Sequence, residues 1–209
     1  MKKLKVLLLN GSPRKNGCTN RALTEVATAL KNNDIDAEII WIGAKPIQGC
    51  TACGVCRKSN GNGECPYKDG VQEFHQLAKS ADGFVFGSPV YYAGANGSLH
   101  SFLDRLFFAY GSSLKGKVGA CICSARRAGT TATIDNLNKY LLINQMPIAS
   151  SNYWNAVHGS VPEDVEKDLE GLQTMRMLGN NMAWLLKSIH IANIPFPTEE
   201  TKIKTNFIR

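Results

Sequence analysis

The stretch that decides the fold is "KVLLLNGSPRKNGCTN", residues 5–20. It begins with "KVLLLN" (5–10), a continuous apolar run of strand length, and leads into a segment of helical period that starts at Asn20. The loop between them combines glycines, hydroxyls and a cation, and it ends at a helix N-terminus. Backbone N–H groups and the helix dipole favour an anion at such a position. The stretch therefore predicts the first strand–loop–helix unit of an α/β protein, with an anion site in its loop.

The same alternation of strand and helix patterns continues along the chain. Further strands are predicted at 36–42, 83–88, 117–123 and, more weakly, 146–151, and helices at 20–33, 71–80, 97–110, 131–145 and 163–189. Continuous apolar strands that alternate with helices indicate a parallel sheet covered on both faces. We therefore predict an α/β fold with a flavodoxin-like, doubly wound, five-stranded parallel sheet of order 2-1-3-4-5.

The composition is that of one globular domain. The chain has 209 residues, of which 44% are hydrophobic and 20% charged. We assign residues 1–190 to this domain, including a cysteine-rich insertion at about 43–68, and residues 191–209 to a C-terminal tail. The first apolar run is too short for a secretory signal and no run reaches the roughly 18 residues of a membrane span. We expect a cytoplasmic protein with reduced thiols and no membrane partner.

The net charge of +7 does not indicate a nucleic-acid partner. No predicted helix carries a basic stripe interleaved with aromatic residues, which is the usual footprint of such binding. In the predicted strand order, strands 1, 3 and 4 lie side by side, and ligands bind beyond their carboxyl ends. The three loops that follow these strands are therefore where a ligand site is expected.

The first loop, "NGSPRKNGCTN" (10–20), is typical of a pocket for a single phosphate. It lacks the Lys-Ser/Thr pair of a Walker loop and the G-x-G-x-x-G pattern of a dinucleotide turn. The residues that would hold one phosphate are Ser12, Arg14, Thr19 and Asn20. The alternative is an ordinary turn in which Thr19 caps the helix.

The second loop, "GSPVYYAGANGS" (87–98), can form an apolar wall with open backbone groups beside it. Tyr91 and Tyr92 offer aromatic faces, a combination that suits a planar ligand, although both tyrosines could equally pack in the core or an interface. The third loop, "CSARRAGT" (123–130), places two adjacent arginines at the mouth of the sheet. They suit an anion or a partner subunit, the alternative being a solvated surface.

Three stretches of the sequence resemble those of a known family. They are "VLLLNGSPRKNGCTN" (6–20), "ADGFVFGSPVYYAGANGSLHSFLDR" (81–105) and "SARRAGTT" (124–131). They resemble the NADPH-dependent FMN reductases of the flavodoxin-like superfamily and are especially similar to the iron–sulfur flavoprotein branch. The resemblance continues through "EGLQTMRMLGNNMAWLLK" (170–187), so it covers nearly the whole chain.

The resemblance implies an FMN site built from the three loops. The FMN phosphate would lie at the first loop, and the isoalloxazine ring against the second and third. The cofactor-binding residues so expected are Ser12, Arg14, Asn16, Cys18, Thr19, Asn20, Pro89, Val90, Tyr91, Tyr92, Gly94, Ser124, Arg126, Arg127 and Gly129. The resemblance also implies a homodimer or homotetramer with FMN near the subunit interface. Asp104 and Arg105 are expected to fix helix and subunit geometry rather than to perform chemistry.

Four cysteines gather in "CTACGVCRKSNGNGEC", residues 50–65. Cys50, Cys53 and Cys56 recur at intervals of three and Cys65 follows, which resembles the ligand set of a 4Fe-4S cluster. Iron–sulfur flavoproteins of this family carry such a motif after strand 2, although the last gap here is longer than their compact pattern. Free or redox-labile thiols, and a zinc site, remain as alternatives.

These observations together predict an FMN-dependent oxidoreductase. It would take a hydride from NAD(P)H and pass electrons to a quinone, a nitro or azo compound, a flavin or a protein, through the cluster if one is bound. The cofactor carries the chemistry, so no catalytic side chain is predicted, and Arg126 or Arg127 would meet a nicotinamide nucleotide phosphate. One alternative is an electron carrier reduced by ferredoxin. Another is a phosphatase using the C-x5-R spacing of Cys121 and Arg127, which the position of Cys121 inside a predicted strand disfavours.

Overall fold

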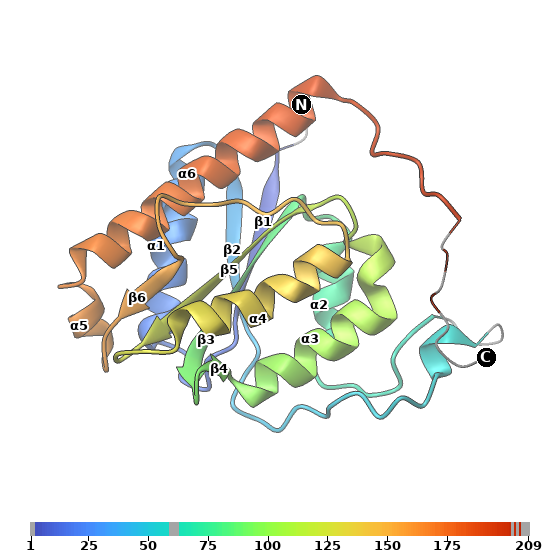
Figure 1. Cartoon of the computed structure of the whole chain (residues 1–209), viewed down its shortest axis with the longest axis horizontal. Helices are drawn as coiled ribbons and strands as arrows, with labels where there is room; N and C mark the ends of the chain where they lie inside the picture. The colour runs from blue at the N-terminus through green and yellow to red at the C-terminus, as the bar shows by residue number, and fades with distance from the viewer. Residues whose placement is uncertain (1–2, 59–62, 202, 204, 206–209) are drawn as a thin grey trace.

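The computed structural model describes residues 3–58, 63–201, 203 and 205, and Figure 1 shows the chain. The elements are β1 (Lys5–Asn10), α1 (Cys18–Asn32), β2 (Asp36–Trp41), η1 (Val55–Arg57), α2 (Val71–Ala78), β3 (Gly83–Tyr91), β4 (Gly94–Ala95), α3 (Gly97–Tyr110), η2 (Gly111–Ser113), β5 (Val118–Ala125), α4 (Thr130–Ile143), β6 (Ala156–His158), α5 (Pro162–Val165) and α6 (Leu169–Ala192). Parts of the predicted insertion (59–62) and tail (202, 204 and 206–209) lie outside the described residues. No helix of the described part is long and apolar enough to cross a membrane.

The sheet has the predicted doubly wound topology. Its order is β2-β1-β3-β5-β6, with all these neighbours parallel, and β4 pairs antiparallel with β3 as a short hairpin arm. Without β4, this is the predicted order 2-1-3-4-5. The carboxyl ends of β1, β3 and β5 therefore meet at one edge of the sheet.

The strands sort their side chains between two helical layers. Successive residues of a strand point to opposite faces, so Val6 and Leu8 pack toward α1 and α6, whereas Leu7 and Leu9 pack toward α2, α3 and α4. All four side chains are fully buried. Figure 1 shows the two layers, with α3 and α4 on one face and α1 and α6 on the other. Burial on both faces explains why the strand is apolar without interruption from Val6 to Leu9.

The predicted fifth strand at 146–151 is wrong as a continuous element. Ile148 makes an isolated bridge to Gly119, the chain then leaves the sheet, and it pairs with β5 again only in β6. Polar residues interrupt the edge: the Asn155 side chain donates from Nδ2 to the Cys121 carbonyl at 3.1 Å. That side-chain bond occupies a carbonyl that an unbroken edge strand would contact with its backbone.

The predicted helix at 163–189 is also two elements rather than one. It breaks between α5 and α6, where Asp168 serves as the N-cap of α6 and its Oδ1 accepts a hydrogen bond from the Gly171 N–H at 2.9 Å. A capping carboxylate satisfies the first N–H groups of a helix and so favours a helix start at that point.

The helices α1 and α6 pack so closely that one position admits only glycine. A Cβ atom on Gly179 would lie 2.6 Å from the Ala29 Cβ and 2.8 Å from the Val26 carbonyl oxygen. The contact is with backbone on one side, so a larger residue must push the two helices apart.

We predict that Gly179→Leu lowers the free energy of unfolding by about 2 kcal/mol, because overpacking outweighs the gain in helix propensity. Urea denaturation followed by circular dichroism measures the change. Gln173→Leu, on the exposed face of the same helix, is the control and should leave the midpoint nearly unchanged. Equal midpoints for the two variants would contradict the close packing of α1 on α6.

Candidate functional site

Loops from neighbouring strands enclose a cavity of about 250 Å³ at the carboxyl edge of the sheet. The residues that line it come from the loops after β1, β3, β5 and β6. They are Ser12, Arg14, Gly17, Cys18, Thr19, Pro89, Val90, Tyr91, Ser124, Ala125, Arg126, Gly159 and Ser160. The three loops singled out by the sequence thus contribute to one site, which we call the edge cavity.

A buried asparagine shapes the first loop. Asn10 is fully buried at the end of β1; its Oδ1 accepts from the Ser12 N–H and its Nδ2 donates to the Lys15 carbonyl, both at 3.0 Å. The Ser12 hydroxyl oxygen in turn accepts from the Arg14 N–H at 3.1 Å. These bonds hold the loop in a curved form that sets Ser12 and Arg14 at the cavity.

The start of α1 faces the same cavity with its backbone donors available. Gly17 is the N-cap, and among the described residues no side chain caps this end. Thr19 lies inside the helix, so the alternative in which it caps α1 is wrong. Its hydroxyl instead lies 2.8 Å from that of Ser124, which joins the first loop to the third. A helix end with free N–H groups beside Arg14 is an electropositive site suited to an anion.

The second loop is a tight hairpin that closes one wall of the cavity. Pro89, Val90 and Tyr91 line it, and the chain turns back through Tyr92 and Ala93 at φ of 50° and 57°. Two successive positive φ angles are those of a type I′ turn, which normally takes Asn and Gly. The Tyr92 side chain is fully exposed and points away from the cavity.

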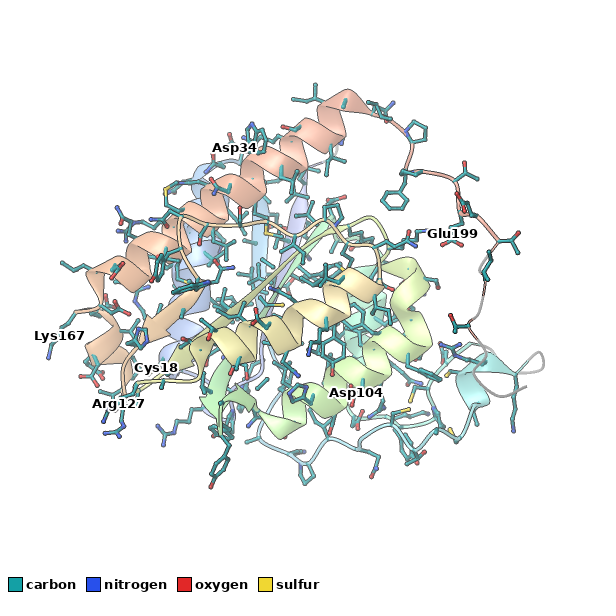
Figure 2. All side chains as sticks on the ribbon, viewed as in Figure 1. Cys18, Asp34, Asp104, Arg127, Lys167 and Glu199 are labelled. Atoms are coloured by element: carbon teal, nitrogen blue, oxygen red, sulfur yellow. The ribbon has the colours of Figure 1, made fainter. Side chains whose placement is uncertain are left out.

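The third loop brings one of its two arginines to the site. Arg126 lines the cavity, whereas Arg127 is exposed, does not line it, and points outward in Figure 2. Gly129 has φ of +89°, and a Cβ there would lie 2.8 Å from the Ala93 Cα. Its role is therefore to let the third loop press against the hairpin.

Some of the predicted cofactor-binding residues do not line the edge cavity. Asn16, Tyr92, Gly94, Arg127 and Gly129 lie outside the cavity wall. Asn20 also lies behind it, where its Oδ1 accepts from the Asn10 Nδ2 at 3.4 Å.

Sequence reasoning missed Gly159 and Ser160, which close the far side of the cavity. They follow the edge strand β6 directly, as the other lining residues follow β1, β3 and β5. The signal was the glycine after "NAVH" (155–158), but the strand predicted at 146–151 hid it. Once the edge strand is placed at β6, the rule that ligands bind at carboxyl ends finds these residues too.

The four clustered cysteines also come together, but away from the edge cavity. Cys50, Cys53, Cys56 and Cys65 line one narrow cavity against the last turns of α3. Cys50 and Cys53 are exposed, Cys56 is half-buried and Cys65 is buried, and burial raises the pKa of the Cys56 thiol. Within the described part of the chain, no three metal-ligating side chains are close enough to hold an ion. We call this the cysteine cavity.

Arg105 fastens both ends of the cysteine segment to α3. This side chain is 1% exposed, and its Nη1 donates to the Gln48 carbonyl at 3.0 Å and to Asp69 Oδ2 at 2.5 Å. Its Nη2 donates to the Tyr67 carbonyl at 2.8 Å, and its Nε to the Cys65 sulfur at 3.2 Å. One buried guanidinium therefore fixes residues before Cys50 and around Cys65, a positioning role that agrees with the expectation for Arg105.

The remaining cysteines do not offer a nucleophile. Cys121 and Cys123 lie buried in β5, where burial raises the pKa of the Cys121 thiol and raises that of Cys123 to about 12. A phosphatase cysteine must be a thiolate in an open loop, so the alternative based on Cys121 and Arg127 is wrong. Burial raises the pKa of Cys18 as well.

A doubly wound parallel sheet with an anion pocket beside an apolar wall, at the carboxyl ends of the strands, is typical of the flavodoxin-like class. Comparison with known proteins gives the family: the model of the NADPH-dependent FMN reductases matches residues 4–160. An iron-sulfur flavoprotein of Methanocaldococcus jannaschii is 32% identical over 194 residues, which are 89% of this chain and 99% of that protein. The chain belongs to the NADPH-dependent FMN reductase family, and it is an NAD(P)H-dependent flavin oxidoreductase.

Two further similarities concern a relative of half the chain and the fold. An FMN-dependent NADPH-azoreductase of Staphylococcus saprophyticus is 29% identical over 103 residues, 49% of this chain and 52% of that one. The crystal structure of a WrbA-like flavodoxin of Agrobacterium tumefaciens superposes with a TM-score of 0.62 at 15% identity, covering 90% of this chain and 99% of the other. The last similarity confirms the fold.

We predict that Arg105→Met lowers the free energy of unfolding by about 3 kcal/mol, because Asp69 and two carbonyls lose their buried donor. The released segment should also let a thiol reagent reach Cys65 quickly in the folded protein. Chemical denaturation and the rate of thiol modification measure the two effects.

Arg57→Met is the matched control, because that guanidinium lies over the Phe108 ring, 4.0 Å from its centroid, on the exposed side of the same segment. It should change neither quantity appreciably. If Arg105→Met behaves like this control, the four hydrogen bonds of Arg105 do not hold the segment.

Proposed function

We propose that the edge cavity holds FMN, and that the bound FMN takes a hydride from NAD(P)H and passes electrons to a quinone, a nitro or azo compound, a free flavin or a protein. The observation that best supports FMN binding is that the cavity has an electropositive part and an apolar part. One end has the uncapped N-terminus of α1 with Ser12 and Arg14, and the other has Val90 and Tyr91 of the hairpin. A phosphate-bearing planar cofactor matches this polarity.

The first loop would hold the phosphate. The N–H groups at the start of α1 and the Arg14 guanidinium supply donors and positive charge, while Ser12 offers a hydroxyl that already orients the loop. Because Asn10 holds the loop in place, these donors need little rearrangement to bind an anion.

The hairpin and the third loop would hold the ring. Pro89, Val90 and Tyr91 form an apolar wall, and Ser124, the register neighbour of Pro89 in β5, lines the cavity together with Arg126. The Thr19–Ser124 hydrogen bond fixes the third loop against the start of α1, and so against the phosphate end of the cavity. FMN, when bound, supplies both the hydride-accepting and the electron-donating chemistry, and the chain's own task is to orient the ring and exclude water.

We further propose that the cysteine cavity binds a 4Fe-4S cluster. The kind and number of donors fit: four thiols line one cavity, and a buried Cys65 is followed by Pro66, as in known cubane ligand motifs. The thiols would have to draw together around the cluster, because no three ligating side chains of the described residues lie close enough to hold an ion as they stand. The name of the archaeal relative, an iron-sulfur flavoprotein, supports the same proposal. Cys50, Cys53, Cys56 and Cys65 would hold the cluster, which would supply one-electron steps.

The separation of the two cavities supports an assembly of subunits. Cys18, which lines the edge cavity, lies on one side of Figure 2, and the cysteine segment lies on the other, beyond Asp104. The two cavities share no lining residue. We therefore propose a homodimer or homotetramer in which the FMN of one subunit lies near the cysteine cavity of another.

We predict that Arg14→Gln weakens the affinity for FMN about tenfold, because one charge-assisted hydrogen bond to phosphate is lost. Riboflavin, which has no phosphate, should bind both forms equally. Lys15→Gln is the control, since Lys15 is the adjacent exposed cation and does not line the cavity. Fluorescence titration measures both affinities, and an equal loss for FMN and riboflavin would place the phosphate elsewhere.

We predict about four irons per chain in protein purified without oxygen. Cys53→Ala should lose the iron and retain stoichiometric FMN, because the two cavities are separate. Thr51→Ala, in the same segment, should retain both. Iron, zinc and flavin assays on one sample test the proposed cluster. Zinc in place of iron, or the absence of both metals, would contradict the cluster but not the flavin site.

Steady-state oxidation of NADH and NADPH with a quinone tests the hydride donor. Turnover is expected with at least one of them. A protein that holds FMN yet oxidises neither, and is reduced only by ferredoxin, would instead be an electron carrier.

A further inference from the structure

A second cavity of about 250 Å³ lies at the edge of the sheet, between the N-terminal ends of α4 and α6 and the strand β6. Its wall includes two aromatic side chains, Tyr153 and Trp154, and the hydroxyls of Thr130 and Thr131. Neither the fold nor the proposed FMN site accounts for it. We call it the second cavity.

The aromatic wall belongs to the loop that interrupts the edge strand, and that loop is fixed. The Ser151 hydroxyl oxygen accepts from the Tyr153 N–H at 3.2 Å, and Asn155 is tied to the Cys121 carbonyl of β5. Tyr153 and Trp154 pack edge to face with ring centroids 4.5 Å apart. Both nevertheless stay more than half exposed, at 59% and 58%. A preorganised but uncovered aromatic wall suits stacking against a flat ligand.

Polar and acidic residues also line the second cavity. Asp168 Oδ2 accepts from the His158 N–H at 2.6 Å while its Oδ1 caps α6, so this part of the lining is also rigid. The carboxylate of Glu170 lines the same cavity. Carboxylates beside an aromatic face are the groups that bind ribose hydroxyls in nucleotide sites.

Residues that line the second cavity are close in sequence to residues that line the edge cavity. His158 lines the second cavity, and the next residue, Gly159, lines the edge cavity. Likewise Arg126 lines the edge cavity, and Thr130 lines the second. The third loop, with Arg126 and Arg127, therefore runs from the edge cavity to the second cavity.

We infer that the second cavity binds the adenosine half of NAD(P)H. The adenine stacks on Trp154, the adjoining ribose meets Glu170, and the pyrophosphate passes the arginines of the third loop. The nicotinamide then reaches the edge cavity. This inference rests on the proposed hydride donor, because NAD(P)H has a second flat group, the adenine, besides the nicotinamide that reacts.

Reduced nicotinamide mononucleotide tests the inference, because it carries the same hydride as NADH and lacks the adenosine half. In the FMN-loaded protein, Trp154→Ala should lower kcat/KM for NAD(P)H about tenfold, the loss typical of one base–aromatic stack. The value for the mononucleotide should not change. Glu170→Gln, at an exposed position, should show the same selective loss, and FMN content reports on folding.

Trp184→Ala is the matched control, since Trp184 is an exposed tryptophan of α6 that lines none of these cavities. It should leave both kinetic values unchanged. Equal losses for NAD(P)H and the mononucleotide, or no loss for either, would overturn the inference. So would an altered oligomeric state of Trp154→Ala without a kinetic change, which would make the wall a subunit contact. If the wild-type protein oxidises none of these donors, the proposed hydride donor fails first.

Discussion

The hydrogen bond from the Gly11 N–H to the Gly87 carbonyl, 2.8 Å long, is the contact on which the edge cavity depends. It continues the pairing of β1 with β3 one residue beyond the end of β1, so the first two loops leave the sheet in contact. There is no room for a side chain at this point, because a Cβ on Gly11 would lie 2.9 Å from the same carbonyl. This close approach of two backbones sets the point from which Ser12 and Pro89, the next residues along each chain segment that line the cavity, leave it.

The helix α3 connects the two sites of the molecule. At its start, the Asn96 side chain caps the helix through the Ser98 N–H at 2.9 Å, directly after the hairpin that walls the edge cavity. At its other end, Arg105 fixes the cysteine segment. A single rigid element thus sets the position of both sites, and a change in the packing of α3 would be felt at each. Because the buried Arg105 is satisfied by the segment it holds, helix and segment depend on each other for their polar contacts.

The fold was predictable because its signals are local and repeated. Each inner strand contains a continuous apolar run, and the loops after β1, β3 and β5 have compositions typical of a ligand site. The edge strand was not predictable from the sequence, because β6 is only three residues long. Its pairing with β5 is interrupted by a loop that is fixed through Asn155. No periodic pattern marks a strand that is split in this way, and the error also concealed Gly159 and Ser160.

The site was predictable by loop but not by side chain. Composition identified the loops, whereas the direction of Arg127 and the bond between Thr19 and Ser124 depend on how separate loops meet. The sequence predicted that Arg105 fixes the geometry of its helix, but not which groups it binds. Its four partners lie 36–57 residues away in the sequence, so no local pattern identifies them.

The hairpin turn at Tyr92 and Ala93 bears on how this surface evolves. Two left-handed backbone positions are occupied by residues that adopt them at a cost of about 1 kcal/mol each or more, although Asn and Gly would adopt them readily. A fully exposed tyrosine contributes nothing to the core in return. Tyr92 therefore lowers the stability of the fold relative to Asn or Gly at the same position. If descendants of this chain retain a tyrosine there, the reason will be a contact that its side chain makes and not the conformation of the turn.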